Sequence, residues 1–230
     1  MNNQSISVLT YNIFLNKAYD ETGRIVEKYR PGIVCLQECS PSIAQEKIGH
    51  LTLAIKAKNG SNGMALYYNK KKFELKSVSS YELPKSLYEM RDPRQRIRQQ
   101  VISLLHRSNK QTFYVSNIHL VHLVVPNSSR RKQLRVAINN LSTVAQNSPR
   151  ILMGDLNYPL FQNRIETIYK EQGFVEVGRK STYKSHKLGL LSGKFDRILM
   201  SKEHWEEIEY TVLPFGSSDH APILSTLKMR

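Results

Sequence analysis

Cysteine and long apolar runs are nearly missing from this chain of 230 residues. Its two cysteines, Cys35 and Cys39, stand four residues apart, whereas a disulfide framework needs more cysteines at longer separations. We expect both to be reduced thiols that pack in the core. No apolar run approaches the roughly 18 residues of a membrane span, and the Met-Asn-Asn-Gln start lacks the basic and apolar segments of a signal peptide. The protein is therefore expected to be intracellular, with no stable membrane insertion.

Acidic residues are also in short supply. The chain has 19 Asp and Glu against 34 Lys and Arg, which leaves a formal net charge of +15. Such a charge predicts a polyanionic partner, and nucleic acid, above all DNA, fits best because each neutralised phosphate releases counterions. An anionic lipid surface would be attracted by the same charge, and a basic protein without a polyanionic partner is the third interpretation. The sequence identifies no protein partner.

The apolar pattern favours many short strands and a few helices. No repeat, low-complexity tract or linker interrupts it, so residues 1–230 are expected to form one domain. The predicted strands are Ile6–Tyr11, Ile33–Leu36, Met64–Tyr68, Phe73–Val78, Val101–Leu105, Phe113–Ile118, Ile151–Met153, Phe195–Met200 and Ile223–Leu227. The predicted helices are Glu21–Tyr29, Ile43–Ile48, Ser128–Ala145 and Phe161–Glu171. We therefore expect an α/β fold in which two mixed β-sheets stack, with helices outside.

Polar side chains that could do catalysis stand at the ends of the predicted strands, where they can leave the core for a shared cleft. They are Asn12, Glu38, His119, Asp155, Asn157, Asp219 and His220. Three carboxylates, two amides and two imidazoles suit the hydrolysis of a phosphodiester with a hard cation. Taken singly, each has a structural explanation, since Asp-x-Asn after glycine is commonly a turn and a lone histidine is commonly structural.

The chemistry of each residue type suggests its role. Glu38, together with substrate oxygens and water, would hold Mg²⁺, or Mn²⁺ in its place. Asp155 would orient and deprotonate the attacking water, which Asn157 would help to fix. His119 and His220 would donate hydrogen bonds to the phosphate oxygens on which charge develops.

Six motifs occur together along the chain. They are Thr10-Tyr11-Asn12, Leu36-Gln37-Glu38, Asn117-Ile118-His119, Gly154-Asp155-Leu156-Asn157, Phe195-Asp196-Arg197-Ile198 and Ser218-Asp219-His220. Their order and rough spacing resemble those of the endonuclease/exonuclease/phosphatase superfamily. The resemblance implies a four-layered α/β sandwich of two packed mixed β-sheets flanked by helices.

The same resemblance assigns site residues. It implies that Asn12 and Glu38 face the metal and that Asp219 supports the metal or the phosphate. His220 would contact the scissile phosphate and Asp196 would orient it, while His119 would assist the transition state. Asp155 and Asn157 would lie at the attacking water, as their chemistry also suggests.

Flanking segments bear on the substrate. Three of them are similar to the 5′-tyrosyl-DNA phosphodiesterase branch: Arg131-Lys132-Gln133-Leu134 after His119-Leu120, then Ser181-Thr182-Tyr183, then Lys194-Phe195-Asp196-Arg197-Ile198. The similarity implies a Mg²⁺-dependent hydrolase that acts at DNA ends, in a repair role. The predicted substrate contacts are Arg98, Arg131, Tyr183 and Arg197, and Tyr183 could stack on an unpaired base.

Other functions stay open on sequence grounds. Arg94, Arg96 and Arg98 alternate, so they would share one face of an extended segment, where they could contact a phosphate backbone or protect an edge strand from aggregation. The superfamily also includes sphingomyelinase-like enzymes, so a lipid or inositol-phosphate phosphodiesterase or phosphatase is the alternative. A catalytically silent nucleic-acid-binding module is the third hypothesis, and the complete set of site residues argues against it.

Overall fold

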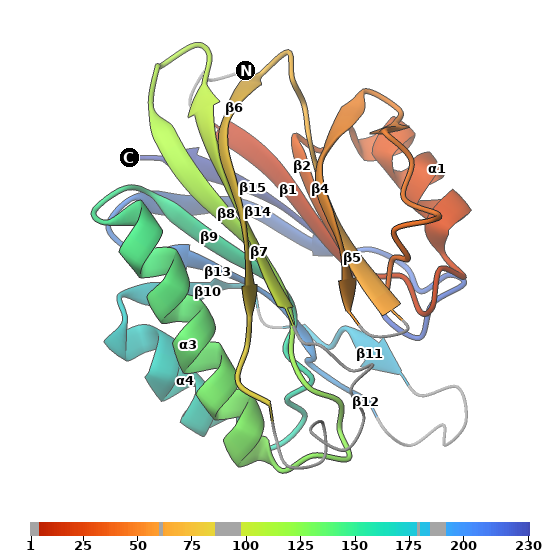
Figure 1. Cartoon of the computed structure of the whole chain (residues 1–230), viewed down its shortest axis with the longest axis vertical. Helices are drawn as coiled ribbons and strands as arrows, with labels where there is room; N and C mark the ends of the chain where they lie inside the picture. The colour runs from red at the N-terminus through yellow and green to blue at the C-terminus, as the bar shows by residue number, and fades with distance from the viewer. Residues whose placement is uncertain (1–4, 60–61, 86–97, 179, 185–191) are drawn as a thin grey trace.

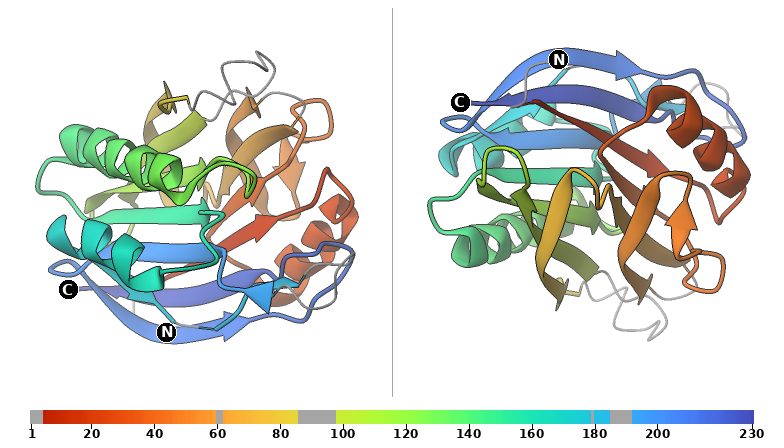
Figure 2. Two further views of the ribbon diagram at one scale, coloured as in Figure 1. Left: turned by 90° about the horizontal axis from the view of Figure 1, so that it is seen from below. Right: turned by 90° about the horizontal axis from the view of Figure 1, so that it is seen from above.

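The structure, a computed structural model, describes residues 5–59, 62–85, 98–178, 180–184 and 192–230. Two mixed β-sheets pack face to face, and helices cover their outer faces (Figure 1). Figure 2 shows the same layers from the two ends of the molecule, with α3 and α4 on one side and α1 on the other. The predicted four-layered α/β sandwich is therefore confirmed.

The first sheet contains both chain ends of the described part. Its seven strands follow the order β14-β15-β1-β2-β5-β4-β3. Their bounds are β1 Ser5–Asn12, β2 Ile33–Gln37, β3 Lys47–Ile48, β4 Leu51–Asn59, β5 Asn62–Tyr68, β14 Trp205–Val212 and β15 Ile223–Met229. Helix α1 (Tyr19–Tyr29) covers its outer face, where an apolar cluster that includes Val26, Leu36 and Tyr67 is fully buried.

The second sheet holds the middle of the chain. Its six strands follow the order β10-β13-β9-β8-β7-β6. Their bounds are β6 Phe73–Glu82, β7 Arg98–His106, β8 Thr112–His119, β9 Arg150–Asp155, β10 Phe174–Val177 and β13 Asp196–Ser201. Helices α3 (Asn127–Ala145) and α4 (Gln162–Glu171) cover its outer face through a separate apolar cluster. A third cluster fills the space between the two sheets. Strands β11 (Tyr183–Lys184) and β12 (Ser192–Gly193) form a small separate ribbon.

Most sequence predictions of local structure are confirmed. All nine predicted strands and three of the four predicted helices are present within the described residues. Cys35 and Cys39 are free and buried, as expected for packing thiols. No helix within the described ranges has both the length and the apolar composition needed to cross a membrane.

The predicted helix Ile43–Ile48 is wrong. Ser40 closes a single turn, because its carbonyl accepts the N–H groups of both Ile43 and Ala44, but the chain then leaves the helical path. Lys47 and Ile48 pair with β4 instead and form the edge strand β3. Six residues are too few to offset the cost of nucleating a helix, whereas pairing with an existing strand gains hydrogen bonds at once.

Strand pairing brings the predicted catalytic residues to one edge of the sandwich. In the parallel pair β1 and β2, Asn12 stands opposite Gln37, the residue before Glu38. In the parallel pair β8 and β9, His119 stands opposite Asp155. Asp196 also stands opposite Asp155, from the antiparallel strand β13. The carboxyl ends of four strands from two different sheets therefore meet at one place.

A buried amide network joins the sheets directly beneath these strand ends. Asn117 donates to the carbonyls of Leu36 and Ala65 and to Gln100 Oε1, at 3.0, 3.2 and 3.0 Å, and accepts from Gln37 Nε2 at 2.7 Å. Gln37 and Asn117 are fully buried. Gln37 directly precedes Glu38, and Asn117 lies two residues before His119. The network therefore holds the strand ends next to these two site residues in a fixed arrangement.

Replacing Asn117 with Leu tests this network. The substitution keeps the approximate volume but leaves several buried polar groups without a partner, so we expect the free energy of unfolding to fall by about 3 kcal/mol. Denaturant unfolding followed by circular dichroism measures the change, with Asn163→Leu on the exposed face of α4 as the control. A loss below about 1 kcal/mol would show that the network contributes little to stability.

Candidate active site

The structure brings all eight predicted site residues into one cluster at the edge of the sandwich, and six of them are buried. Asn12, His119 and Asp155 are the last residues of their strands, and Asp196 is the first residue of β13. Glu38 follows β2, Asn157 follows β9, and Asp219 and His220 lie between β14 and β15. The cluster is built from both sheets, so it exists only when the two sheets are packed together.

Asp155 lies at the centre of the cluster. Its Oδ2 accepts hydrogen bonds from Asn12 Nδ2 at 3.0 Å and from Asn157 Nδ2 at 3.1 Å. His119 Nε2 is 3.6 Å from the same oxygen and His220 Nε2 is 3.9 Å from it. The side chain is 1% exposed, so this carboxylate is held by fixed donors rather than by bulk water.

The backbone around Asp155 adopts conformations that fit its position. Gly154 has a φ of 144°, and a Cβ atom there would lie 1.9 Å from the carbonyl oxygen of Ile118 on the neighbouring strand. Asn157 has a φ of 48°, and its backbone N–H donates to Asp155 Oδ1 at 2.7 Å. The Asp-x-Asn segment is therefore a turn of the kind that short polar side chains favour. The turn brings both side chains into the cluster, so the turn explanation is compatible with the proposed catalytic one.

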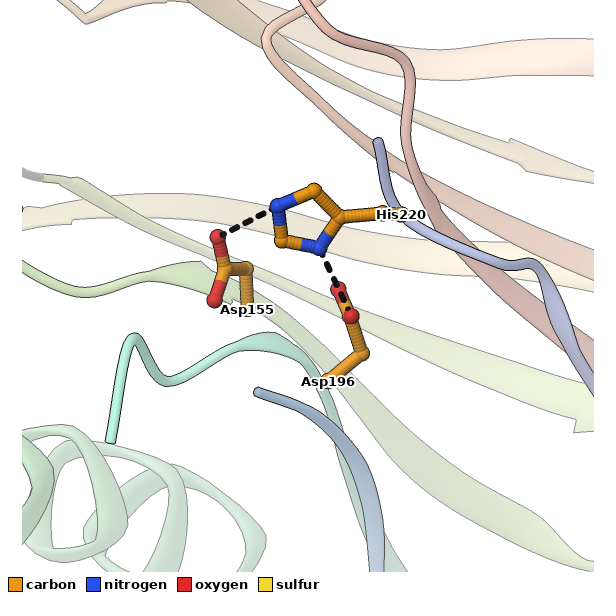
Figure 3. Close-up of side chains that lie close together, drawn as sticks. All are labelled: Asp155, Asp196 and His220. Carbon is orange, nitrogen blue, oxygen red and sulfur yellow. Dashed lines mark hydrogen bonds and ion pairs between the residues drawn. The ribbon is translucent and has the colours of Figure 1, made fainter. Parts of the chain in front are cut away.

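His220 forms a close pair with Asp196. Its Nδ1 donates to Asp196 Oδ2 at 2.8 Å, and Figure 3 shows the ring between the carboxylates of Asp196 and Asp155. Burial opposes a charge on the ring, but the two carboxylates outweigh it and raise the pKa of His220 to about 10. The two carboxylates therefore favour the protonated ring, in which both nitrogens can donate.

Glu38 and His119 form the other side of the cluster. Glu38 Oε1 accepts from Asn12 Nδ2 at 3.3 Å and lies 4.0 Å from His119 Nε2, while Oε2 accepts the backbone N–H of Leu15 at 3.0 Å. Glu38 has a φ of 56°, a left-handed conformation that turns the chain sharply after β2. Its side chain is 15% exposed, so water can reach this side of the cluster.

Two sets of donors fit a divalent cation. The carboxylates of Glu38 and Asp155 both contact Asn12 Nδ2, which places two hard oxygen donors beside an amide and an opening to water. Asp155, Asp196 and His220 also offer atoms that all lie within 4.8 Å of one another. Mg²⁺ prefers oxygen donors and retained water, and His220 Nδ1 is already bound to Asp196, so the Glu38 side suits Mg²⁺ better.

Asp219 lies on the His220 side of the cluster. Its Oδ1 is 4.0 Å from His220 Nε2, and its backbone carbonyl accepts from the N–H of Lys184. The predicted role of Asp219 at the metal or the phosphate is therefore compatible with its place beside the imidazole that would face the phosphate.

Ser218 is a site residue that the sequence reasoning did not assign. Its hydroxyl donates to the carbonyl of Asn12 at 2.7 Å and accepts the backbone N–H of His220 at 3.1 Å. It therefore ties the segment that contains His220 to the end of β1. The signal was present, because a serine hydroxyl often accepts the backbone N–H of the residue two positions later and so closes a turn.

The predicted substrate contacts have different surroundings. Tyr183 is half-buried and stacks on Phe195 with ring centroids 4.2 Å apart, and its centroid is 4.9 Å from that of His220. Arg131 is half-buried and donates to the hydroxyl of Tyr158 at 3.1 Å. Arg98 begins β7, but its side chain lies outside the described part of the structure, as do Arg94 and Arg96.

Arg197 requires a correction. Its guanidinium is fully buried, donates to Glu176 Oε2 at 2.7 Å and also contacts Gln162 Oε1. A buried guanidinium needs such a partner to offset the cost of removing it from water. Arg197 therefore joins β13 to β10 and α4 instead of contacting a substrate. We therefore leave it out of the proposed substrate contacts.

Comparisons with known proteins agree with this geometry. The sequence model of the Endonuclease/Exonuclease/phosphatase family matches residues 9–220. A comparison with curated proteins gives no significant match. Among solved structures, the endonuclease/exonuclease/phosphatase from Bacteroides vulgatus is similar with a TM-score of 0.82 at 16% identity, over 98% of this chain and 99% of that one.

Two further solved structures have more specific names. The mannosyl-6-phosphatase Bt3783 of Bacteroides thetaiotaomicron gives a TM-score of 0.77 at 14% identity, over 98% of this chain and 99% of that one. The humanized D. rerio TDP2 gives a TM-score of 0.77 at 16% identity, over 97% and 99%. At these identities the similarity concerns the fold.

Proposed function

The chain belongs to the endonuclease/exonuclease/phosphatase family of phosphoester hydrolases, and on this basis we propose that it is a Mg²⁺-dependent phosphodiesterase that acts at DNA ends. The observation on which the proposal chiefly rests is the arrangement around Asp155. One buried carboxylate receives two amide donors and lies within 4 Å of two imidazoles, next to a second carboxylate that water can reach. The same arrangement argues against a silent binding module.

Each residue has a task in this proposal. Asp155 accepts a proton from the attacking water, which Asn157 helps to orient. The His220 imidazolium donates from Nε2 to a phosphate oxygen, while Asp196 holds its Nδ1 and so fixes the plane of the ring. His119, whose Nε2 lies 3.6 Å from Asp155 Oδ2, would donate to a second phosphate oxygen.

Glu38 would hold the cation through its carboxylate, which Asn12 orients through Nδ2, and Asp219 would support the metal or the phosphate. When bound, Mg²⁺ would act as a Lewis acid that withdraws negative charge from a phosphate oxygen. Asn12 bridges the carboxylates of Glu38 and Asp155, since its Nδ2 donates to both. Asn12 Oδ1 accepts the backbone N–H of Phe14 at 3.1 Å, which fixes which end of the amide faces the carboxylates.

Removal of divalent cations should abolish turnover. We expect dialysis against EDTA to reduce the rate at least about 100-fold and added Mg²⁺ to restore it, with Mn²⁺ as an effective substitute. Glu38→Gln should raise the Mg²⁺ concentration needed for half-maximal rate, whereas Glu203→Gln, an exposed carboxylate on the β13–β14 turn, should leave it unchanged. Full turnover after exhaustive chelation would exclude the proposed cation.

DNA ends are the substrate that the charge and the surroundings of Tyr183 favour. The net charge of +15 suits a phosphate backbone, and Tyr183 presents an aromatic ring within 5 Å of His220, where an unpaired terminal base could stack. The test offers Mg²⁺ with 5′-tyrosyl DNA, plain DNA ends, closed circular DNA, sphingomyelin and an inositol phosphate. Cleavage restricted to the DNA ends supports the proposal, and intact DNA with cleavage of a lipid or inositol phosphate contradicts it.

A lipid phosphate is the second candidate, and exposed apolar side chains favour it. Among the described residues, eight large apolar side chains are exposed, and six of them stand within five residues of a proposed site residue. These six are Leu15, Ile43, Val124, Leu160, Phe161 and Phe215. Exposed apolar groups can enter a lipid interface, to which a basic protein is also attracted. Co-sedimentation with vesicles of phosphatidylcholine and phosphatidylserine tests this, and a protein that stays in the supernatant contradicts it.

A further inference from the structure

Thr182 is a buried polar residue to which the proposed chemistry gives no part. It stands in the loop before β11 and is 0% exposed. Its Oγ1 accepts two backbone hydrogen bonds, from the N–H of Phe195 at 3.1 Å and from the N–H of Asp196 at 3.0 Å. A single side-chain oxygen thus satisfies two consecutive buried N–H groups at the point where β13 begins.

Both backbone groups of Thr182, its N–H and its carbonyl, are hydrogen-bonded. The N–H of Thr182 donates to the carbonyl of Gly193 at 3.0 Å, and its carbonyl accepts the N–H of Ala221 at 2.7 Å. Just beyond it, Tyr183 forms a β-bridge with His220. Thr182 therefore contacts the strand that contains Asp196 through its side chain and the segment that contains His220 through its backbone.

We propose that Thr182 is a positioning residue that sets the distance between Asp196 and His220. Its side-chain oxygen fixes the backbone of Asp196, and its carbonyl fixes the residue after His220, so that Asp196 Oδ2 meets His220 Nδ1 at 2.8 Å. Asp196 and His220 come from segments more than 20 residues apart, and Thr182 is hydrogen-bonded to both segments. The catalytic consequence rests on the proposed function, but the positioning itself does not.

The side-chain oxygen can be removed without changing the shape of the residue. Thr182→Val keeps the branched side chain but leaves the N–H groups of Phe195 and Asp196 without an acceptor, whereas Thr182→Ser keeps the oxygen. A small misplacement of a catalytic group is costly, so we expect Thr182→Val to lower kcat about 30-fold with little change in KM. Thr182→Ser should stay within about threefold of the wild type. If Thr182→Val does not fold, Thr182→Ala removes the same oxygen together with the γ-methyl group.

A double-mutant cycle separates positioning from a general loss of stability. If Thr182 acts through Asp196, adding Thr182→Val to Asp196→Ala should lower kcat no further, because the pair is already broken. Multiplication of the two single effects, or a kcat of Thr182→Val equal to that of the wild type, would overturn the proposal.

A spectroscopic measurement tests the positioning without any substrate. The proton on His220 Nδ1, bound to Asp196, should give a downfield proton resonance in the wild type and in Thr182→Ser, assigned by its loss in His220→Gln. We expect this resonance to be lost or shifted in Thr182→Val. If the wild type shows the resonance but hydrolyses no phosphoester, the proposed function fails and the positioning stands. An unchanged resonance in Thr182→Val overturns the positioning.

Discussion

Asp155→Asn should reduce the turnover of the enzyme by about 10⁴-fold, because it removes the base that accepts the proton of the attacking water. The substitution also disturbs the cluster itself. Oδ2 accepts from Asn12 and Asn157, and Oδ1 accepts the backbone N–H of Asn157, so an amide nitrogen at either position would face a donor. Binding of a DNA end should survive, since most of its affinity is expected from phosphate contacts elsewhere on the basic surface.

The measurement compares initial rates with substrate affinity by fluorescence anisotropy in the same preparation. Asp20→Asn in the first turn of α1 is the matched control, because it removes the same charge at an exposed position. It should keep the wild-type rate. A rate in Asp155→Asn within tenfold of the wild type would remove Asp155 from the proposed role as base.

His220→Ala is the second change with a large expected effect. It removes an imidazolium that donates from Nε2 and is held by Asp196 at 2.8 Å, and loss of one such donor costs about 10³-fold in kcat. The substitution also leaves the carboxylates of Asp155 and Asp196 close together without the cation between them. Burial already raises the pKa of Asp196 and His220 lowers it, so we expect the pKa of Asp196 to rise further in the variant.

His204→Ala provides the comparison for this variant. His204 is half-buried beside Glu203 and has no contact with the cluster, so its loss should leave kcat unchanged. Thermal unfolding of both variants shows how much of any loss in rate is a loss of folded protein. A His220→Ala enzyme with wild-type kcat would show that the imidazolium does not act on the transition state.

The sequence predicts which residues lie together because two independent features agree in it. Each site residue follows or precedes an apolar run, which places it at a strand end, and the residue types match one kind of chemistry. Parallel pairing of β1 with β2 and of β8 with β9 then forces these ends to one edge. Asp196 is the exception, since it begins its strand, and it reaches the same edge because β13 runs antiparallel to β9.

Other parts of the fold depend on contacts that no local pattern shows. Strand β14 contains three exposed glutamates and was not predicted, yet it pairs with β15 at the sheet edge, where one face is open to water. Arg197 follows a site residue directly and looked like a substrate contact, but successive residues of a strand point to opposite faces. Its partner Glu176 is 21 residues away, on a strand that was not predicted either.

The supporting polar residues show the same limit. Thr182 and Asn117 are ordinary polar residues in the sequence, and their roles follow from hydrogen bonds to segments far along the chain. Each is fully buried, where an unsatisfied partner is costly. Such residues can be recognised only when the segments that they join are known to be neighbours.

Hydrolysis in oxygen-18-labelled water tests the central claim most directly. The substrate is the p-nitrophenyl ester of thymidine 5′-phosphate, with Mg²⁺, and the product nucleotide is analysed by mass spectrometry. Attack of water on phosphorus within the Asp155 cluster predicts one labelled oxygen in the released thymidine 5′-phosphate, formed by the wild type and not by Asp155→Asn. Label in the nitrophenol, or equal product formation by the two proteins, would contradict the account.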